Sequence, residues 1–413
     1  MRAGFSQVEI TPPRDVDLFG YDFRQERLAP GNDGIHDPLF ARALAIAGDQ
    51  AVDGGVAGGG VILLSLDLLL ISVPFARRLR AEIARRLGLS SERVVVACTH
   101  THSGPNLDEP ELVADLALAL PHTAARITAA GKDGTGQRYA ASVVAQAIEA
   151  AERAWGSLAP VTAAAASAAV GLAYDRRVVS ADGVRYCWNP HETPELAPRP
   201  AADPALTVLS LRRAHGGAPI VVLNHGAHPV VLGKTSRVVS ADWPGAALRH
   251  LDTHLGGAQG IFVLGACGDT HPWIATQVDP AGIEPVGAAA GSLAACLAHA
   301  ARPGQAQDLR AVGRTIHLSE IELDVAAWRI GPAVLVAAPV ELFSALGADL
   351  RRRCRRPLLL ATNANGWTGY WPTRQSFAEG IYEIDFAKAI GRKPGDGEAL
   401  VDALAALIAE IDG

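Results

Sequence analysis

The sequence contains few cysteines, no excess of positive charge and no long hydrophobic run. Its five cysteines are odd in number, widely scattered and never spaced as CxxC, which excludes a disulfide framework and a thiolate zinc cluster. The longest apolar run, residues 61–71, is about half of the ~20 residues that a membrane-spanning helix needs. The N-terminal residues are charged and lack the apolar segment of a secretory signal. We therefore expect a cytoplasmic protein without a transmembrane segment.

The charge balance and the apolar content narrow the class of protein further. Lys and Arg number 37 against 43 Asp and Glu, which gives a formal net charge of −6. Surfaces that bind nucleic acid usually carry a basic excess, so a nucleic-acid partner is not expected. Hydrophobic residues make up 49% of the 413 residues, which is enough for a large buried core.

Strand and helix patterns alternate along the whole chain. Apolar runs predict strands at residues 93–98, 220–224 and 261–265, and helical periodicity predicts helices at 138–155, 286–301 and 341–353. Residues 107–136 read as a loop with one short helix. This alternation favours the α/β class, with a mixed β-sheet core flanked by helices. We expect a single large domain over residues 1–413, with the proline-rich stretch 190–204 as an internal loop or linker.

Histidines gather directly after two of the predicted strands. His100 and His102 follow the strand at 93–98, and their spacing places both rings on one side of an extended chain. His225 and His228 follow the strand at 220–224. Active sites of α/β proteins favour loops beyond the carboxyl ends of strands, so these loops are candidates for a metal site.

Two further loops add acidic groups and a histidine. Asp269 and His271 follow the strand at 261–265, and Asp242 precedes a predicted helix, where it would equally serve as an N-cap. Imidazole and carboxylate ligands without thiolates suit Zn²⁺ in a hydrolytic role. The sequence has no HExxH, no GxSxG and no Walker A motif, so zincin peptidases, serine hydrolases of the elbow type and P-loop enzymes are excluded.

The string HTHSGP at residues 100–105 resembles the signature of the neutral/alkaline, non-lysosomal ceramidases, which are zinc amidases. Other segments resemble that family in the same order: residues 4–12 (GFSQVEITP), 228–230 (HPV), 268–269 (GD) and 338–341 (APVE). The block at residues 365–383 is also similar, although Trp367 stands where the family has tyrosine. The resemblance spans nearly the whole chain and implies the family's catalytic N-terminal domain, without its C-terminal β-sandwich.

The resemblance implies a set of four zinc ligands and one Zn²⁺ per chain. These ligands fall on His100, His228, Glu341 and Tyr370. Glu341 would begin the helix at 341–353, where the helix dipole favours an anion.

The resemblance also implies the catalytic side chains. His102 would act as the general acid and base, and Arg176 and Tyr382 would stabilise the oxyanion. Four further residues are candidates to contact these ligands and catalytic side chains and hold their orientation: His225, Asp242, Asp269 and His271.

The sequence thus predicts a zinc-dependent hydrolase that cleaves an N-acyl amide of a small or lipid-like molecule with metal-activated water. An ester or lactone is an alternative linkage. A phosphoesterase with two metals at Asp242, Asp269, His271 and the HxH pair is another alternative. The alternative from a different class is a non-catalytic protein that binds zinc or lipid.

Overall fold

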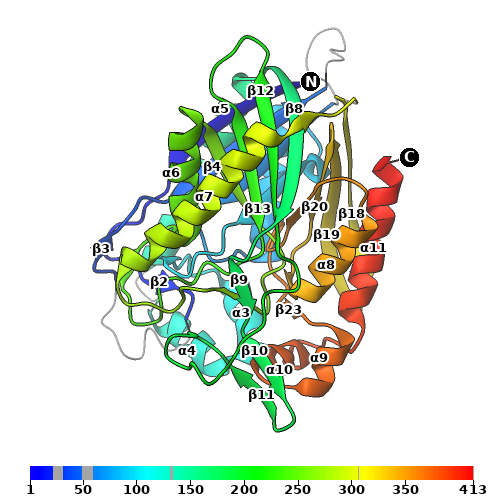
Figure 1. Cartoon of the computed structure of the whole chain (residues 1–413). Coiled ribbons are helices and arrows are strands. Elements are labelled where there is room, and N and C mark those ends of the chain that lie inside the picture. The colour runs from blue at the N-terminus through cyan, green and yellow to red at the C-terminus, as the bar shows by residue number, and fades with distance from the viewer. Residues whose placement is uncertain (22–30, 49–58, 131–133, 306, 413) are drawn as a thin grey trace.

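The computed structural model describes residues 1–21, 31–48, 59–130, 134–305 and 307–412. Two β-sheets pack face to face, and helices cover both outer faces (Figure 1). A buried apolar cluster lies between the sheets, and three further clusters lie between the sheets and their helices. The α/β class with a sheet core flanked by helices in one domain is therefore confirmed.

The larger sheet has nine strands and runs in the order β15-β13-β12-β8-β1-β4-β5-β6, with β17 paired to β8. Its strands are β1 (Arg2–Glu9), β4 (Phe40–Ala47), β5 (Gly60–Leu66), β6 (Val94–Cys98), β8 (Ala159–Ala169), β12 (Ala205–Arg213), β13 (Ile220–His225), β15 (Gln259–Leu264) and β17 (Arg302–Pro303). Strands β5, β6 and β13 are buried along their whole length, as expected for strands covered on both faces.

This sheet bends sharply in its middle. Only two residue pairs, Arg2 with Pro160 and Ala3 with Ala159, join β1 to β8. The Ser65 hydroxyl on β5 donates to the carbonyl of Phe262 on β15 over 2.7 Å. The bend therefore brings the two ends of the sheet together, and the chain exits of β6, β13 and β15 meet.

The smaller sheet runs in the order β18-β19-β20-β22. Its strands are β18 (Leu309–Leu318), β19 (Ile321–Ile330), β20 (Ala333–Ala337) and β22 (Leu358–Ala361). The helices α8 (Ser344–Arg353) and α11 (Asp396–Asp412) cover its outer face (Figure 1). The parallel pair β20 and β22 ends near the exit of β6, because Ala97 forms an isolated bridge with Ala364.

Four long helices cover the larger sheet. They are α2 (Val73–Leu87) and α5 (Thr135–Gly156) over one half, and α6 (Asp242–Leu255) and α7 (Ile283–Ala300) over the other. Helix α2 is capped at its start by Ser72, whose hydroxyl accepts from the amide of Phe75, and at its end by Gly88, which has a φ of 67°. These are the residue types that favour helix starts and left-handed helix ends. The helices predicted at 138–155 and 286–301 are confirmed as α5 and α7.

Two predicted segments differ from the structure. The predicted loop at 107–136 contains two helices within its described residues before α5, α3 (Pro110–Ala119) and α4 (Pro121–Ala130), because Pro110 and Pro121 each start a new helix. The helix predicted at 341–353 begins only at Ser344, and the residues before it pair as a short strand.

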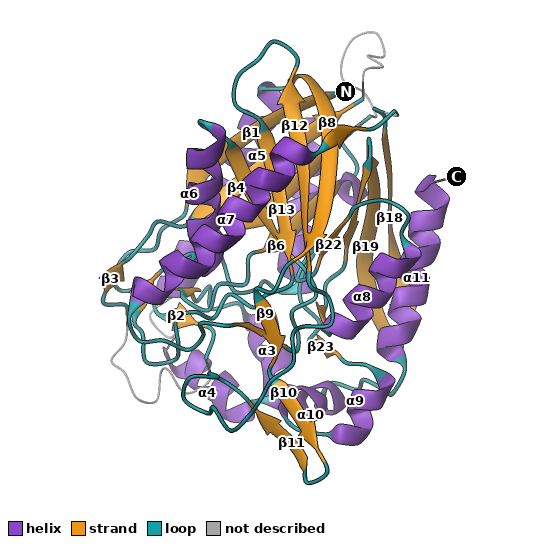
Figure 2. Cartoon of the chain, in the orientation of Figure 1, coloured by secondary structure: helices purple, strands orange, loops and turns teal. Residues whose placement is uncertain are grey.

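The remaining elements are short and lie among the loops at one end of both sheets. They are β2 (Leu18–Phe19), β3 (Gly34–Ile35), β7 (Gly104–Pro105), β9 (Ala173–Asp175), β10 (Arg177–Ser180), β11 (Gly183–Tyr186), β14 (Val238–Val239), β16 (Thr270–Pro272), β21 (Glu341–Leu342), β23 (Tyr370–Trp371), α9 (Arg374–Glu379) and α10 (Tyr382–Ala389). Figure 2 shows these loops gathered between the lower ends of the strands and α3, α4, α9 and α10.

The run Pro280–Ala300, which includes α7, is long and apolar enough to cross a membrane by length and composition alone. In this fold the helix packs against α6 and contributes to a buried cluster through Ile283, Val286 and Ala290. Its apolar face is thus accounted for by packing within the chain.

Candidate active site

His100 is held rigidly at the exit of β6. Its backbone has a φ of 67°, the left-handed region that non-glycine residues rarely adopt. The amide of His100 donates to the Leu68 carbonyl over 2.9 Å. The ring Nδ1 lies 2.8 Å from the Leu69 carbonyl, and the side chain is buried. These contacts fix the direction in which Nε2 points.

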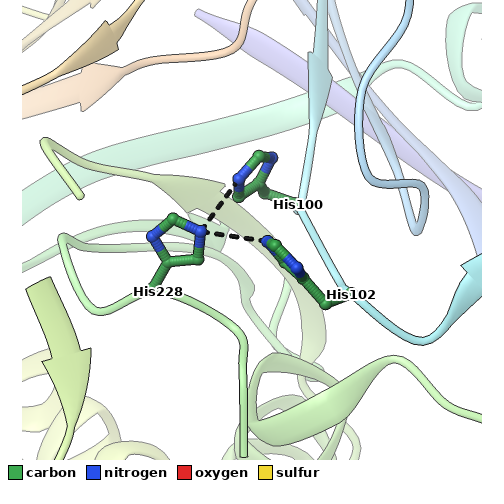
Figure 3. A group of neighbouring side chains, drawn as sticks. All are labelled: His100, His102 and His228. Atoms are coloured by element: carbon green, nitrogen blue, oxygen red, sulfur yellow. Dashed lines mark hydrogen bonds between the residues drawn. The ribbon is translucent and has the colours of Figure 1, made fainter. Parts of the chain in front are cut away.

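His228 approaches His100 from the loop after β13. Its Nδ1 lies 3.0 Å from the Cys267 carbonyl. Its Nε2 lies 3.1 Å from Nε2 of His100 and 3.0 Å from Nε2 of His102. Figure 3 shows the three rings converging on this nitrogen. The bend of the larger sheet thus brings together residues 126 and 128 positions apart.

Glu341 completes this cluster from β21, in the segment that follows β20 of the smaller sheet. Its Oε1 lies 3.6 Å from Nε2 of His100 and 3.8 Å from Nε2 of His228. Its Oε2 accepts from the indole of Trp367 over 3.0 Å. Burial alone would raise the pKa of Glu341, but His100 and the Trp367 hydrogen bond lower that pKa overall. The expected placement at a helix start is wrong, because Glu341 lies in β21 and is oriented by strand pairing and Trp367.

These three side chains fit a divalent cation. A carbonyl oxygen only accepts, so the carbonyls beside Nδ1 of His100 and His228 require N–H at both Nδ1 atoms. In the neutral rings each Nε2 then carries a lone pair, and the two lone pairs face one another beside a carboxylate. Oε1 of Glu341 is buried and accepts no hydrogen bond within the described ranges. Two imidazoles and a carboxylate, each with an oriented partner behind it, are an ordinary zinc donor set.

The electrostatics of His228 agree with this tautomer. Burial lowers the pKa of His228 well below its usual value, and the neighbouring His100, His102 and Arg176 lower it further. The ring is therefore neutral, which is the form that binds a metal.

Tyr370 and Tyr382 lie at the same pocket as His100, His102 and Glu341. Tyr370 stands opposite Glu341 in the β21–β23 pairing, and burial together with that carboxylate raises the pKa of its hydroxyl. Tyr382 begins α10 and is 37% exposed. Their rings lie 5.8 Å apart, and Tyr370 is buried whereas Tyr382 is exposed, so Tyr370 lines the interior of the pocket and Tyr382 its rim.

Arg176 is buried in a network of its own. Its Nε donates to Oε1 of Glu383 over 2.8 Å, and Nη2 donates to the Gly268 carbonyl over 2.9 Å. Its Nη1 lies 3.1 Å from Nε2 of His271. Glu383 also accepts from the hydroxyl of Tyr186. The guanidinium is therefore held on three sides next to His228.

The two aspartates that were predicted to orient the site, Asp242 and Asp269, both accept hydrogen bonds from backbone amides. Asp242 accepts from the amides of Val231 and Leu232, over 3.2 and 3.0 Å, and so fixes the loop after His228. Asp269 accepts from the amide of Ser344 over 2.7 Å at the start of α8.

The two remaining predicted histidines differ in their distance from the cluster. His271 contacts Arg176, and its ring centroid lies 5.9 Å from that of His228. His225 turns away, with Nδ1 3.0 Å from the Ala205 carbonyl and its ring against Trp243.

Three side chains at the site were not among the predicted site residues. Cys267 lies close enough to His228 and Glu341 for the three to hold one metal ion between them. Glu383 anchors Arg176, and Trp367 anchors Glu341. Glu383 directly follows Tyr382 and Cys267 directly precedes Gly268, so adjacency to the resembling segments was the only available hint.

Comparison with known proteins bears on the fold and the family of this chain. No curated protein matches the chain. The neutral ceramidase from Pseudomonas aeruginosa superposes with a TM-score of 0.74 at 17% identity, over 100% of this chain and 74% of that one. A ceramidase complexed with C2 superposes with a TM-score of 0.72 at 18% identity, over 99% and 75% of the two chains. The sequence profile described as neutral/alkaline non-lysosomal ceramidase, N-terminal, matches residues 1–278. The chain belongs to the neutral/alkaline non-lysosomal ceramidase family.

Proposed function

We propose that this protein is a zinc-dependent hydrolase that cleaves the amide bond of an N-acyl amide. Membership of the ceramidase family supports an amide hydrolase. The observation that carries the proposal is the convergence of Nε2 of His100, Nε2 of His228 and Oε1 of Glu341. Tyr370, which lines the same pocket, is the proposed fourth ligand.

A zinc ion held by these residues would supply a water of lowered pKa and polarise the substrate carbonyl. His102 is suited to move the protons. Its Nε2 lies 3.0 Å from Nε2 of His228, and the side chain is half-buried at the pocket. Imidazole is the side chain that exchanges protons most readily near neutral pH. We assign it to take a proton from the attacking water and to return it to the leaving amine.

Arg176 and Tyr382 are the proposed donors to the carbonyl oxygen as it gains negative charge. Nη1 of Arg176 carries two N–H groups, and its one hydrogen bond among the described residues is to His271. The Tyr382 ring lies at the rim of the pocket, where its hydroxyl can meet a substrate. Fixed donors of this kind are worth roughly 3–4 kcal/mol each to the transition state.

A phosphoesterase with two metals fits less well. The carboxylates that would hold the second metal, Asp242 and Asp269, are both buried and accept backbone amides. An ester or lactone would use the same groups as an amide and remains the second choice of linkage.

The test is hydrolysis of N-acyl amides by the purified protein, with 4-nitrophenyl phosphate as the competing substrate class. We expect amide hydrolysis that a chelator abolishes and added Zn²⁺ restores. Replacing His102 by alanine should lower kcat by roughly 10²–10⁴-fold while the metal is retained. Phosphate hydrolysis without amide hydrolysis would favour the phosphoesterase, and metal binding without any turnover would favour the binding protein. The cytoplasmic location stays a prediction, to be checked by cell fractionation.

A further inference from the structure

Two pockets lie on either side of one aromatic pair. The first, here called the inner pocket, has a volume of about 80 Å³ and is lined by His100, His102 and Glu341. The second, here called the outer pocket, has a volume of about 290 Å³. Both are lined by Trp367 and Phe386, so these two rings form a partition between them.

The partition is rigid. Trp367 is held by the hydrogen bond from its indole to Oε2 of Glu341 over 3.0 Å. The Phe386 ring packs edge-on against Trp367 at a centroid distance of 5.4 Å and against Tyr370 at 5.6 Å. Both partition side chains are at most 5% exposed. A close-packed aromatic wall of this kind yields to a substrate only at the cost of its contacts.

The inner pocket is small for a lipid chain. A water-sized group needs roughly 10–15 Å³ of such volume, so the inner pocket takes roughly five to eight groups and the outer pocket roughly twenty or more. The inner pocket therefore accommodates a short chain, whereas the outer pocket would accommodate a long one.

The order of contacts indicates which arm of the substrate meets the partition. Trp367 bonds to Glu341, Glu341 lies beside His100 and His228, and His228 lies beside His102. Trp367 thus contacts the Glu341 side of the cluster, whereas His102, which we assign to protonate the leaving amine, contacts its His228 side. The acyl arm then points toward Trp367 and Phe386, and the amine arm points toward His102.

We propose that the Trp367–Phe386 partition limits the acyl group of the substrate to a short chain of up to about six carbons. This inference rests on the proposed amide hydrolysis and deepens it by naming the acyl class. Removing the Phe386 ring would join the inner pocket to the outer one, and longer acyl chains would then be accepted.

The experiment compares N-acyl 4-nitroanilides with butanoyl, hexanoyl and dodecanoyl chains. For the unaltered protein we expect kcat/KM to fall by roughly tenfold or more between hexanoyl and dodecanoyl, because a pocket too small for the longer chain discriminates at about this level. In Phe386→Ala the ratio of kcat/KM for the hexanoyl substrate to that for the dodecanoyl substrate should decrease or fall below one. The control is Phe377→Ala, which removes a similarly buried ring, 7% exposed, that lines neither pocket. It should keep the original chain-length profile.

The outcomes separate this inference from the proposed function. If no amide of any length is hydrolysed, the proposed function fails. If hexanoyl and dodecanoyl amides are hydrolysed equally, amide hydrolysis stands and the chain-length limit is refuted. A reciprocal series with a butanoyl group and lengthened N-alkyl chains checks the direction. A length limit on that arm alone would show that the amine, not the acyl group, faces the partition.

Discussion

Nε2 of His100 and Nε2 of His228 lie 3.1 Å apart, although both rings donate from Nδ1 to backbone carbonyls and neither Nε2 carries a proton in the neutral form. Two lone pairs at this separation repel one another unless a cation lies between them. The carboxylate of Glu341, also within 3.8 Å of both, makes the position still more favourable for a cation. A cation bound between these three groups would relieve this repulsion.

The first prediction is that metal binding depends on His100. We expect His100→Ala to lose the bound metal, because it removes one of the two imidazole donors, the one whose Nε2 lies 3.1 Å from His228 and 3.6 Å from Glu341. The measurement is metal content per chain by mass spectrometry after dialysis. His317→Ala, which changes a largely exposed histidine on β18, is the matched control and should retain the metal. Undiminished zinc in His100→Ala would place the metal elsewhere.

The positions of His100 and His228 after strands were predictable because the pattern that marks a strand end lies in neighbouring residues of the sequence. His100 and His228 follow buried β-branched strands, and strand ends are recognisable from the sequence. Their meeting depends on the bend between β1 and β8, where only two residue pairs join the strands. Bends of this kind have no local signature, so candidate residues for the cluster were predictable from the sequence but their geometry was not.

Glu341 illustrates what local patterns miss. The residues after it are helical and the preceding proline suggests a helix start, so residues 341–353 were expected to form one helix. Glu341 instead pairs with Tyr370 across β21 and β23, a contact between segments 29 residues apart. Tertiary pairing here overrides local propensity. Only family resemblance, not residue spacing, pointed to Glu341, Tyr370 and Tyr382.

Glu383 should act as a positioning residue for Arg176. We expect Glu383→Gln to lower kcat more than it raises KM, because the carboxylate orients and neutralises a buried guanidinium without lining the pocket. Losing one partner of a buried ion pair also costs roughly 3–5 kcal/mol of stability. The measurements are steady-state kinetics and thermal unfolding. The control is Glu379→Gln, which removes a less buried partner of Arg177. A rise in KM with unchanged kcat would contradict the positioning role.

The contact between α6 and α7 depends on a glycine. A Cβ at Gly287 would lie 2.2 Å from the Cβ of Ala246. Gly287→Ala gains about 1 kcal/mol of helix propensity but forces the two helices apart, which costs roughly 1–3 kcal/mol. We expect net destabilisation in denaturant unfolding, reduced when Ala246→Gly is added. Gly171→Ala, where nothing lies within 4 Å of the new Cβ, should leave stability nearly unchanged. Equal stability of both alanine variants would argue against close α6–α7 packing.

Glu109 should make stability depend on pH. Its Oε2 accepts from the amide and hydroxyl of Ser72, over 3.1 and 2.6 Å, and burial raises its pKa from 4.5 to about 7. Glu111 raises this pKa slightly and Arg78 lowers it slightly. Between these two pKa values the folded state keeps a proton that the unfolded state releases. The contribution of Glu109 to the free energy of unfolding therefore falls as pH rises from 4.5 to about 7, and it is constant above that pH.

Glu109→Gln removes this titration and keeps an oxygen acceptor for Ser72. We measure the free energy of unfolding of both proteins in urea between about pH 4.5 and 7.5. The value for the variant minus the value for the unaltered protein should increase with pH, by at most about 3 kcal/mol across the range. Glu111→Gln is the control, because this carboxylate pairs with Arg78 and its pKa is lowered by that hydrogen bond. Its stability relative to the unaltered protein should change little or move in the opposite direction. Parallel pH profiles for Glu109→Gln and the unaltered protein would mean that Glu109 is ionised throughout, and that the capping of α2 by Ser72 tolerates a buried charge beside it.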